Sequence, residues 1–215
     1  SVVGSPLNAP LITKYVGLLK DLKQSGHQVV AVVGGGSLAR EFIKVAKELG
    51  LEEKNRDWAA IHVSRLFAQL FTLGLGDNGC GCVPVSVEEA EACLETGKVV
   101  VLGGLRPGMT TDSVAALVGE KIKADLLVKG SNVDGIYDKD PKKFSDAKKL
   151  DTIKFDDLDK IFEANSHRAG INQIIDPEAV KILQRCRLKT VVVDGFDSNN
   201  VFLAVSGEKI GTVIT

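Results

Sequence analysis

The sequence predicts an α/β fold in which a parallel sheet is covered by helices on both faces. Short runs rich in valine and isoleucine alternate along the chain with longer segments whose apolar residues recur at helical spacing. This alternation is typical of parallel strands joined by helices. The run over residues 29–33 contains no polar residue, as expected for a strand that is buried on both faces.

The first half of the chain begins with a helix. Leu11, Tyr15 and Leu22 belong to an apolar set at helical spacing, and Gly26 follows as a stop signal. Gly50 closes a later helix in the same way. The predicted elements are a helix over 11–22, a strand over 29–33, helices over 38–49 and 57–73, a short strand over 82–85, a helix over 87–94, a strand over 99–102 and a helix over 112–122.

The second half continues the alternation of strands and helices. The predicted elements are a strand over 126–129, helices near 155–164 and over 177–186, a strand over 190–193, a short helix near 200–205 and a final strand over 212–214. Residues 74–81 and 130–152 are predicted to be irregular.

Composition limits the class of protein. The chain has 215 residues, 44% hydrophobic and 26% charged, with a formal net charge of −1, which suits one globular domain or two closely packed lobes. The near-neutral charge and the 5% of aromatic residues argue against nucleic acid as a partner. No apolar run approaches the roughly 20 residues of a membrane span, and no signal peptide opens the chain. We expect a cytoplasmic protein with no membrane partner.

The spacing of the four cysteines matches no familiar metal-binding motif. Cys80 and Cys82 form a C-x-C pair, and neither a second pair nor a neighbouring histidine completes a zinc site. Cys93 and Cys186 stand alone in the sequence. We expect four reduced cysteines, some of them buried, and no metal ligands.

Three predicted strands lead into loops rich in glycine and small polar residues, over 34–37, 103–112 and 131–137. Right-handed crossovers place such loops at one edge of a parallel sheet, where ligands bind. Glycine N–H groups can approach an anion closely, and a following helix N-terminus adds partial positive charge. The triple glycine therefore predicts a phosphate site, with Arg40 within reach of a phosphate oxygen and Lys129, at the end of its strand, as a further phosphate contact.

Two better-known nucleotide motifs fit less well. Residues 34–39 match G-x-G-x-x-A, but a helix rather than a strand precedes the acidic residue Asp57. The second loop resembles a Walker A sequence in which Met109 stands at the lysine position, and methionine cannot neutralise phosphate charge. Asp112 is interpreted as the N-cap of the next helix, and Tyr137 as a ring against which a nucleobase could lie.

Three segments, in this order, resemble the amino-acid-kinase superfamily and, within it, archaeal-type uridylate kinases. They are VVGGGSLAR over 32–40, PGMTTD over 107–112, and NVDGIY over 132–137 followed by DPK over 140–142. The resemblance implies a three-layer α/β/α sandwich around a mainly parallel sheet. It also implies transfer of the γ-phosphate of ATP to UMP with Mg²⁺, and a homo-oligomer, usually a hexamer. The single domain, residues 1–215, would have a UMP lobe over about 1–125 and an ATP lobe over about 126–215.

The matching positions imply a set of site residues. UMP would contact Gly35, Asp57, Leu105, Arg106, Pro107, Gly108, Met109, Thr110 and Thr111, with Asp57 on the ribose. ATP would contact Gly36, Arg40, Ser131, Asn132, Tyr137 and Asp140, with Ser1 and Lys142 as further candidates. Arg40 and Lys129 are the candidates for charge stabilisation during catalysis. No protein residue is expected to ligate a metal, since Mg²⁺ would arrive with ATP.

The sequence departs from the family pattern at two places. Met109 replaces the histidine that archaeal members carry in PGHTTD. The family also opens with a strand ending in Gly-Gly-Ser, whereas this sequence starts at Ser1, so we expect about ten further residues in the natural protein, the length of one strand and its turn. The open alternatives are another acceptor (an amino-acid carboxylate, carbamate or isopentenyl phosphate) or a non-catalytic nucleotide- or anion-binding protein.

Overall fold

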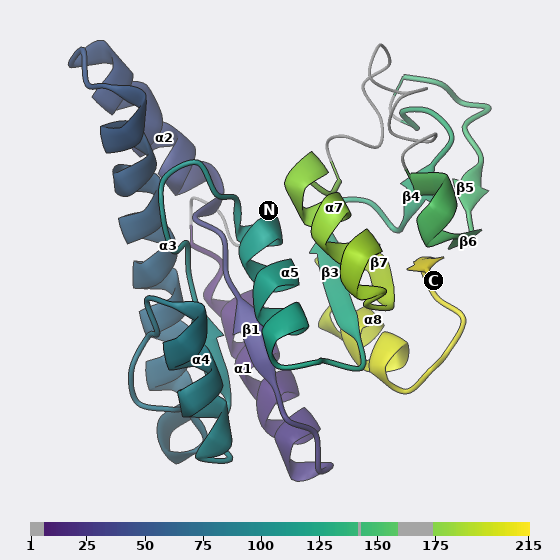
Figure 1. Ribbon diagram of the computed structural model, residues 1–215, viewed down its shortest axis with the longest axis horizontal. Helices are drawn as coiled ribbons and strands as arrows, with labels where there is room; N and C mark the ends of the chain where they lie inside the picture. The colour runs from purple at the N-terminus through teal and green to yellow at the C-terminus, as the bar shows by residue number, and fades with distance from the viewer. Residues whose placement is uncertain (1–6, 142, 159–173) are drawn as a thin grey trace. The chain divides into compact units, whose positions relative to one another are not determined.

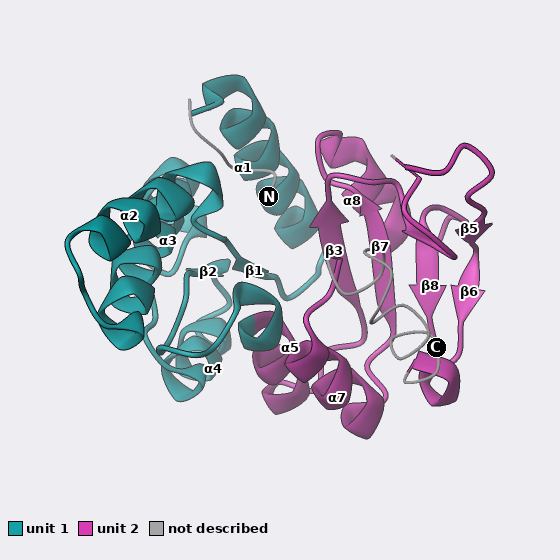
Figure 2. Ribbon diagram, turned by 90° about the horizontal axis from the view of Figure 1, so that it is seen from above, with its two compact units in different colours: residues 1–114 teal, residues 115–215 magenta. Residues whose placement is uncertain are grey.

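The computed structural model describes residues 7–141, 143–158 and 174–215 (Figure 1). The chain divides into two compact units, unit 1 over Ser1–Val114 and unit 2 over Ala115–Thr215 (Figure 2). The division falls within one helix, α5 (Thr111–Lys121).

Unit 1 holds a pair of parallel strands and several helices. Strand β1 (Val30–Val32) pairs in parallel with β2 (Val100–Leu102), so that Val30 lies opposite Val100. The helices of this unit are α1 (Ala9–Gln24), α2 (Gly36–Glu48), α3 (Glu53–Leu75), the 3-10 turn η1 (Gly76–Asn78), α4 (Val87–Glu95) and the first residues of α5.

The core of unit 1 forms where α1 and α3 pack against the strands. Phe67 and Phe71 of α3 share one cluster with Val16 of α1 and with Val99 and Val101 at β2. All three residues of β2 are fully buried, whereas β1 is only partly buried. The expectation that β1 is buried on both faces was therefore wrong: among the described residues β1 pairs with β2 alone.

Unit 2 holds a four-stranded sheet in the order β3-β7-β8-β6. Strands β3 and β7 are parallel, as are β6 and β8, while β7 and β8 are antiparallel. A separate antiparallel pair is formed by β4 and β5. The elements are β3 (Leu127–Ser131), β4 (Ile136–Tyr137), β5 (Lys149–Leu150), β6 (Thr152–Ile153), the 3-10 turn η2 (Phe155–Asp157), α7 (Pro177–Cys186), β7 (Thr190–Asp194), α8 (Ser198–Val205) and β8 (Thr212–Ile214).

Helices cover both faces of the sheet in unit 2. Val192 of β7 belongs to a cluster with Leu183 of α7. Its neighbours Val191 and Val193 belong to a second cluster with Ala204 of α8. Because successive side chains of a strand point to opposite faces, α7 and α8 lie on opposite sides of β7, as Figure 2 shows. The sheet is thus the middle layer of an α/β/α arrangement.

Side-chain caps fix the starts of several helices. Asn8 accepts a hydrogen bond from the N–H of Leu11 at the start of α1. Ser86 accepts from the N–H of Glu89 in α4, and Asp176 accepts from two N–H groups of α7. These side chains satisfy donors that have no partner within the helix, so local sequence alone sets these boundaries.

Most of the predicted elements are confirmed to within a few residues, including α7 at both ends. The strand predicted over 82–85 was wrong, because the chain there is a loop that contains Pro84, which has no N–H for a ladder. Strands β4, β5 and β6 lie in or next to the stretch predicted to be irregular. The helix predicted near 155–164 begins as η2, and its part from residue 159 lies outside the described residues.

Among the described residues, no helix combines the length and the apolar character needed to cross a membrane.

Candidate active site

The triple glycine connects β1 to α2, and a different steric reason favours glycine at each of the three positions. A Cβ on Gly34 would lie 3.3 Å from Oγ1 of Thr111, and a Cβ on Gly35 would lie 2.5 Å from the Cβ of Ala39. Gly36 has a φ of +59°, in the left-handed region that side chains disfavour. The turn is therefore pressed between its own helix and the loop after β2, and no other residue type fits it without movement.

The N-terminus of α2 is suited to an anion. No side chain caps this helix within the described part of the chain, and its N-cap position is Gly35. Unsatisfied N–H groups at a helix start carry partial positive charge and point outward. Arg40 lies one turn into α2 and is exposed to solvent. The predicted phosphate site at the triple glycine thus combines a helix start that no described side chain caps with an exposed cation on the same helix.

Helix α3 lies directly against the second glycine loop, which follows β2. A Cβ on Gly103 would lie 2.6 Å from the backbone N of Arg65, and one on Gly104 would lie 3.0 Å from a side-chain carbon of Ile61. Ser64 is buried, donates to the carbonyl of Ile61 at 2.7 Å and accepts from the N–H of Gly104 at 2.8 Å. The loop therefore starts from a fixed position on α3.

Arg65 fastens the next residues of the same loop. Its Nε donates to the carbonyl of Gly104 and its Nη2 to the carbonyl of Leu105, both at 2.9 Å. The guanidinium also lies over the ring of Trp58, 5.8 Å from the centroid, and that ring stacks on His62. These contacts order the backbone of the loop rather than its side chains.

Asp57 reaches the tip of the loop that was predicted to wrap UMP. Its Oδ2 accepts a hydrogen bond from the N–H of Gly108 at 2.8 Å, and Gly108 has a φ of +75°. The structure therefore brings Asp57 together with loop residues some fifty positions away in sequence. Next to Asp57, Nε of Arg56 is buried, and no hydrogen-bond partner for it lies among the described residues.

The end of the loop merges into α5. Thr110 accepts a hydrogen bond from the N–H of Ser113 at 3.1 Å, which is the geometry of an N-cap. The interpretation of Asp112 as the N-cap was wrong, because α5 already begins at Thr111. The other predicted UMP contacts of this loop are Leu105, Arg106, Pro107, Met109 and Thr111, of which Arg106 is exposed and the other four are half-buried.

Sequence analysis did not single out Ser64, Arg65 or Arg56. The first two lie seven and eight positions after Asp57, two helical turns along α3. This spacing places them on the same side of the helix as Asp57, and it was the signal in the sequence that could have identified them. A buried serine and a backbone-binding arginine within an apolar helix become meaningful only when the loop that they hold is known.

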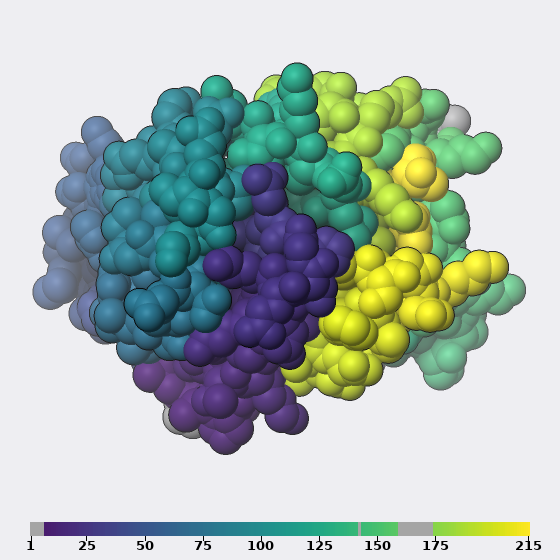
Figure 3. All heavy atoms as spheres, turned by 90° about the horizontal axis from the view of Figure 1, so that it is seen from below, coloured from purple at the N-terminus to yellow at the C-terminus, as the bar shows by residue number. Residues whose placement is uncertain are grey.

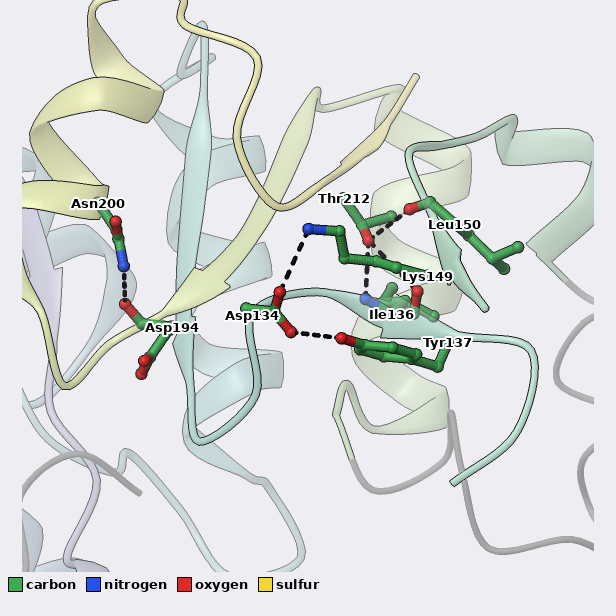
Figure 4. Close-up of polar contacts among 8 residues, drawn as sticks. All are labelled: Asp134, Ile136, Tyr137, Lys149, Leu150, Asp194, Asn200 and Thr212. Carbon is green, nitrogen blue, oxygen red and sulfur yellow. Dashed lines mark hydrogen bonds and ion pairs between the residues drawn. The ribbon is translucent and has the colours of Figure 1, made fainter. Parts of the chain in front are cut away.

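In unit 2, the loop after β3 is closed by a small polar network (Figure 4). The hydroxyl of Tyr137 donates to Oδ1 of Asp134 at 2.7 Å, and Nζ of Lys149 lies 3.2 Å from Oδ2 of the same carboxylate. The hydrogen bond from Tyr137, aided by Lys149, holds the pKa of Asp134 below its usual value. The same hydrogen bond raises the pKa of Tyr137.

Thr212 attaches the β4–β5 pair to the main sheet of unit 2. This residue is fully buried at β8. Its Oγ1 accepts from the N–H of Ile136 at 2.7 Å and donates to the carbonyl of Leu150 at 2.6 Å (Figure 4). One hydroxyl thus satisfies a backbone group on each strand of the pair, which sets the position of Tyr137.

Ser131 ends β3 beside the end of β7. It is buried, pairs in register with Asp194, and its carbonyl accepts from the N–H of Gly195 at 2.8 Å. Nδ2 of Asn200 donates to the carbonyl of Asp194 at 3.0 Å (Figure 4). The ends of these two parallel strands are therefore tied together at the edge where α/β proteins bind ligands.

The remaining predicted ATP contacts have varied surroundings. Asn132 is exposed, and Oδ2 of Asp140 lies 3.8 Å from Nζ of Lys143. Lys129 is the third of the five residues of β3, so the premise that it ends its strand was wrong, and Ser131 holds that position. Ser1 and Lys142 lie outside the described residues.

The described residues contain no cluster of three or more carboxylate ligands. The aspartates after β3 are used by the protein itself: Asp134 binds Tyr137 and Lys149, and Asp138 accepts from the N–H of Lys148. Mg²⁺ commonly keeps several waters and is held mainly by substrate phosphates. The site therefore fits a magnesium ion that is carried by the nucleotide better than one held in a protein cage.

Comparison with known proteins decides the family. The model of the amino acid kinase family matches residues 1–194. This chain belongs to the amino acid kinase family. Uridylate kinase of Methanocaldococcus jannaschii is 46% identical over 187 residues, which cover 87% of this chain and 83% of that protein. Uridylate kinase of Sulfurisphaera tokodaii is 42% identical over 91% of this chain and 87% of its own.

Comparison with solved structures agrees with this assignment. The crystal structure of uridylate kinase from Archaeoglobus fulgidus superposes with a TM-score of 0.88 at 38% identity, over 99% of this chain and 97% of that one. UMP kinase from Bacillus anthracis, at 19% identity and a TM-score of 0.82, supports the fold alone. The predicted α/β fold and the family resemblance are confirmed.

The unfolding free energy at acidic pH tests the network around Asp134. A carboxyl whose pKa is lowered in the folded state stabilises the protein fully above about pH 5 and loses this contribution as pH falls through the folded pKa. The unfolding free energy of the wild type should therefore fall more steeply below about pH 5 than that of Asp134→Asn. Urea denaturation over a pH series measures this difference.

Tyr137→Phe provides a second measurement for the same network. Loss of the hydroxyl should move the pKa of Asp134, followed by carboxyl NMR, upward toward its usual value. Identical pH profiles of the wild type and Asp134→Asn, together with an unmoved Asp134 resonance in Tyr137→Phe, would contradict the network.

Proposed function

We propose that the chain transfers the γ-phosphate of ATP to UMP, which yields UDP and ADP. The observation that carries the proposal is its similarity to archaeal uridylate kinases over nearly its whole length. The local geometry is consistent with that activity, because phosphoryl transfer demands positioning and charge neutralisation more than a protein nucleophile. A cytoplasmic location, where pyrimidine nucleotides are made, is part of the proposal.

Unit 1 would bind UMP through the two glycine loops. The UMP phosphate would lie at Gly35, near the open N-terminus of α2, and Arg40 would neutralise charge as the phosphate is attacked or transferred. The loop over 105–111 would cover the base, with the hydroxyls of Thr110 and Thr111 as donors or acceptors. Asp57 holds this loop at Gly108 and, as a carboxylate that can accept several hydrogen bonds, would also receive a ribose hydroxyl.

Unit 2 would bind ATP at the carboxyl ends of β3 and β7. Ser131 and Asn132 lie at this edge, and the ring of Tyr137 is held in place by Asp134. An aromatic ring in a fixed orientation is a suitable surface for adenine. Lys129 and Asp140 would complete the ATP side. Mg²⁺ bound to the ATP phosphates would neutralise part of their negative charge.

A panel of acceptors tests the proposed reaction. Purified protein with ATP and Mg²⁺ should form ADP rapidly with UMP. With an amino acid, carbamate or isopentenyl phosphate it should form ADP no faster than without acceptor. Coupled measurement of ADP gives the rates. Fast turnover with one of the other acceptors would replace UMP, and no turnover with any of them would favour a non-catalytic binding protein.

The variant Arg40→Ala tests whether the measured activity depends on the proposed phosphate contact. Loss of a charge-assisted phosphate contact costs about 1.5–3 kcal/mol, so kcat/KM for UMP should fall about 10- to 100-fold. Lys44→Ala is the matched control, since Lys44 is an exposed cation one turn further along α2 that pairs with Glu48. An equal effect of both variants would remove Arg40 from the site.

Asp57 should matter more for UMP than for ATP. Asp57→Ala removes the acceptor for Gly108 and for the ribose, so the Kd for UMP should rise about tenfold or more, as expected for loss of hydrogen bonds to a charged group. The Kd for ATP should change little. Calorimetric titration with each nucleotide measures both, and Asp77→Ala, an exposed aspartate at η1, is the control. Equal losses for ATP and UMP would indicate a purely structural role.

An apolar face on unit 1 supports self-association. Phe42 and Val45 of α2 and Leu49, directly after its last residue, are 51%, 54% and 72% exposed, and Leu66, Leu70 and Leu73 of α3 are 58%, 40% and 68% exposed. Each set follows helical spacing and so forms one stripe, and α2 packs against α3. The blue atoms of α2 lie at the molecular surface in Figure 3. Exposed apolar side chains gathered in stripes are typical of protein interfaces, so we propose a homo-oligomer, a hexamer by resemblance to the family.

The double variant Leu66→Glu/Leu73→Glu tests this face. Charges on the stripe should disfavour its burial against a second copy, which lowers the molar mass measured by light scattering during size exclusion. Phe202→Glu on α8, where the side chain is 42% exposed, should leave the mass unchanged. A wild-type monomer, or an unaltered mass of the double variant, would exclude this interface.

A further inference from the structure

Three of the four cysteines meet at one point of unit 1. Sγ of Cys82 lies 4.0 Å from Sγ of Cys80 and 3.6 Å from Sγ of Cys93. All three sulfur atoms lie within 4.8 Å of one another. Cys80 and Cys93 are joined by a disulfide, while Cys82 is free and exposed. The expectation of four reduced cysteines was therefore wrong, because folding brings Cys93 next to Cys80.

Backbone contacts on both sides hold the cysteines in place. The N–H of Cys80 donates to the carbonyl of Val99 at 3.0 Å, just before β2 begins. Cys93 lies near the end of α4, whose start is fixed from both directions: Glu89 donates its N–H to Ser86 and accepts from the N–H of Val85. This reciprocal arrangement is a capping box extended by one residue. The approach of the sulfur atoms therefore rests on the fold and not on the disulfide alone.

The position of Cys82 has no explanation in a disulfide between the other two. A single disulfide uses two sulfur atoms, so the bond between Cys80 and Cys93 does not require a third sulfur in contact with both. Three sulfurs around one point are instead what a thiophilic ion requires. With Zn–S bonds of about 2.3 Å, sulfur ligands at tetrahedral angles lie roughly 3.8 Å apart, close to the two distances from Cys82.

We propose that Cys80, Cys82 and Cys93, after reduction of the Cys80–Cys93 disulfide, bind one zinc ion. A thiol reductant supplies two electrons and two protons to the S–S bond and is itself oxidised to a disulfide. Zn²⁺ then forms three Zn–S bonds, and the three thiols release their protons to solvent. Thiolate ligands select zinc over magnesium or calcium, and the exposure of Cys82 leaves the fourth position for water.

The place of this three-cysteine site makes its role structural. β2 starts just after Val99, the backbone partner of Cys80, and ends at Leu102, which leads into the glycine loop. The cysteines thus lie at the amino end of β2, and the loop proposed for UMP lies at its carboxyl end. A zinc ion would fasten the segment after η1 to α4, in addition to the hydrogen bond that Cys80 donates to Val99.

Cobalt titration tests the site on the full chain. The protein is reduced with a phosphine, freed of metal by chelation and titrated with Co²⁺, whose thiolate complexes have intense charge-transfer bands. One equivalent should saturate the bands, and Zn²⁺ should displace Co²⁺. Cys82→Ser, an exposed position, should bind Co²⁺ more weakly by at least the roughly 10- to 100-fold that loss of a supporting partner costs. Cys186→Ser, which changes the free cysteine of α7, should bind like the wild type.

A second readout separates metal binding from the disulfide. Zn²⁺ should raise the Tm of the reduced wild type and of Cys186→Ser, but not that of Cys82→Ser. Alkylation and intact mass count the thiols before metal is added, and four are expected. A Cys80–Cys93 disulfide that survives the reductant, Co²⁺ binding that is equal in Cys82→Ser and the wild type, or no thiolate bands at all would each overturn the proposal.

Discussion

The close approach of helix α3 to the glycine loop after β2 is the constraint on which the rest of unit 1 depends. A Cβ on Gly103 would overlap the backbone of Arg65 in α3, whereas Gly35 is in ordinary contact with α3 and is crowded by Ala39 of its own helix. Because the backbone of Gly103 itself forms this contact, the loop after β2 is held against α3 without any large side chain between them.

The same helix then provides the polar contacts that shape the second loop. Ser64, Arg65 and Asp57 bind successive parts of it, from Gly104 to Gly108, through backbone groups. Backbone contacts fix where the loop runs while leaving its side chains for a ligand. A loop that is ordered before the ligand arrives loses less conformational entropy on binding, which is consistent with the proposed binding of UMP.

Unit 2 reaches a comparable order by different means. There a buried threonine, Thr212, holds the β4–β5 pair, and a tyrosine–aspartate–lysine network orients the ring of Tyr137. Thr212 binds backbone groups of both strands of the pair, and Asp134 joins two side chains of unit 2, whereas unit 1 combines polar contacts with the steric proximity of Gly103 to α3. In both units the loop after a parallel strand is well positioned at the carboxyl end of that strand.

The sequence by itself determined the α/β class, nearly all of the longer helices and strands, and the position of the glycine-rich loops that are proposed to carry the site, because periodicity and glycine placement are local signals. It also suggested Asp57, but not its bond to Gly108. The tertiary structure alone decided the very short strands, the capping of α5 by Thr110, the partners Ser64 and Arg65, and the meeting of Cys93 with Cys80 and Cys82. These features depend on how segments distant in the sequence pack together. Where a loop crosses a helix, the residues in contact show no repeating sequence pattern from which the contact could be predicted.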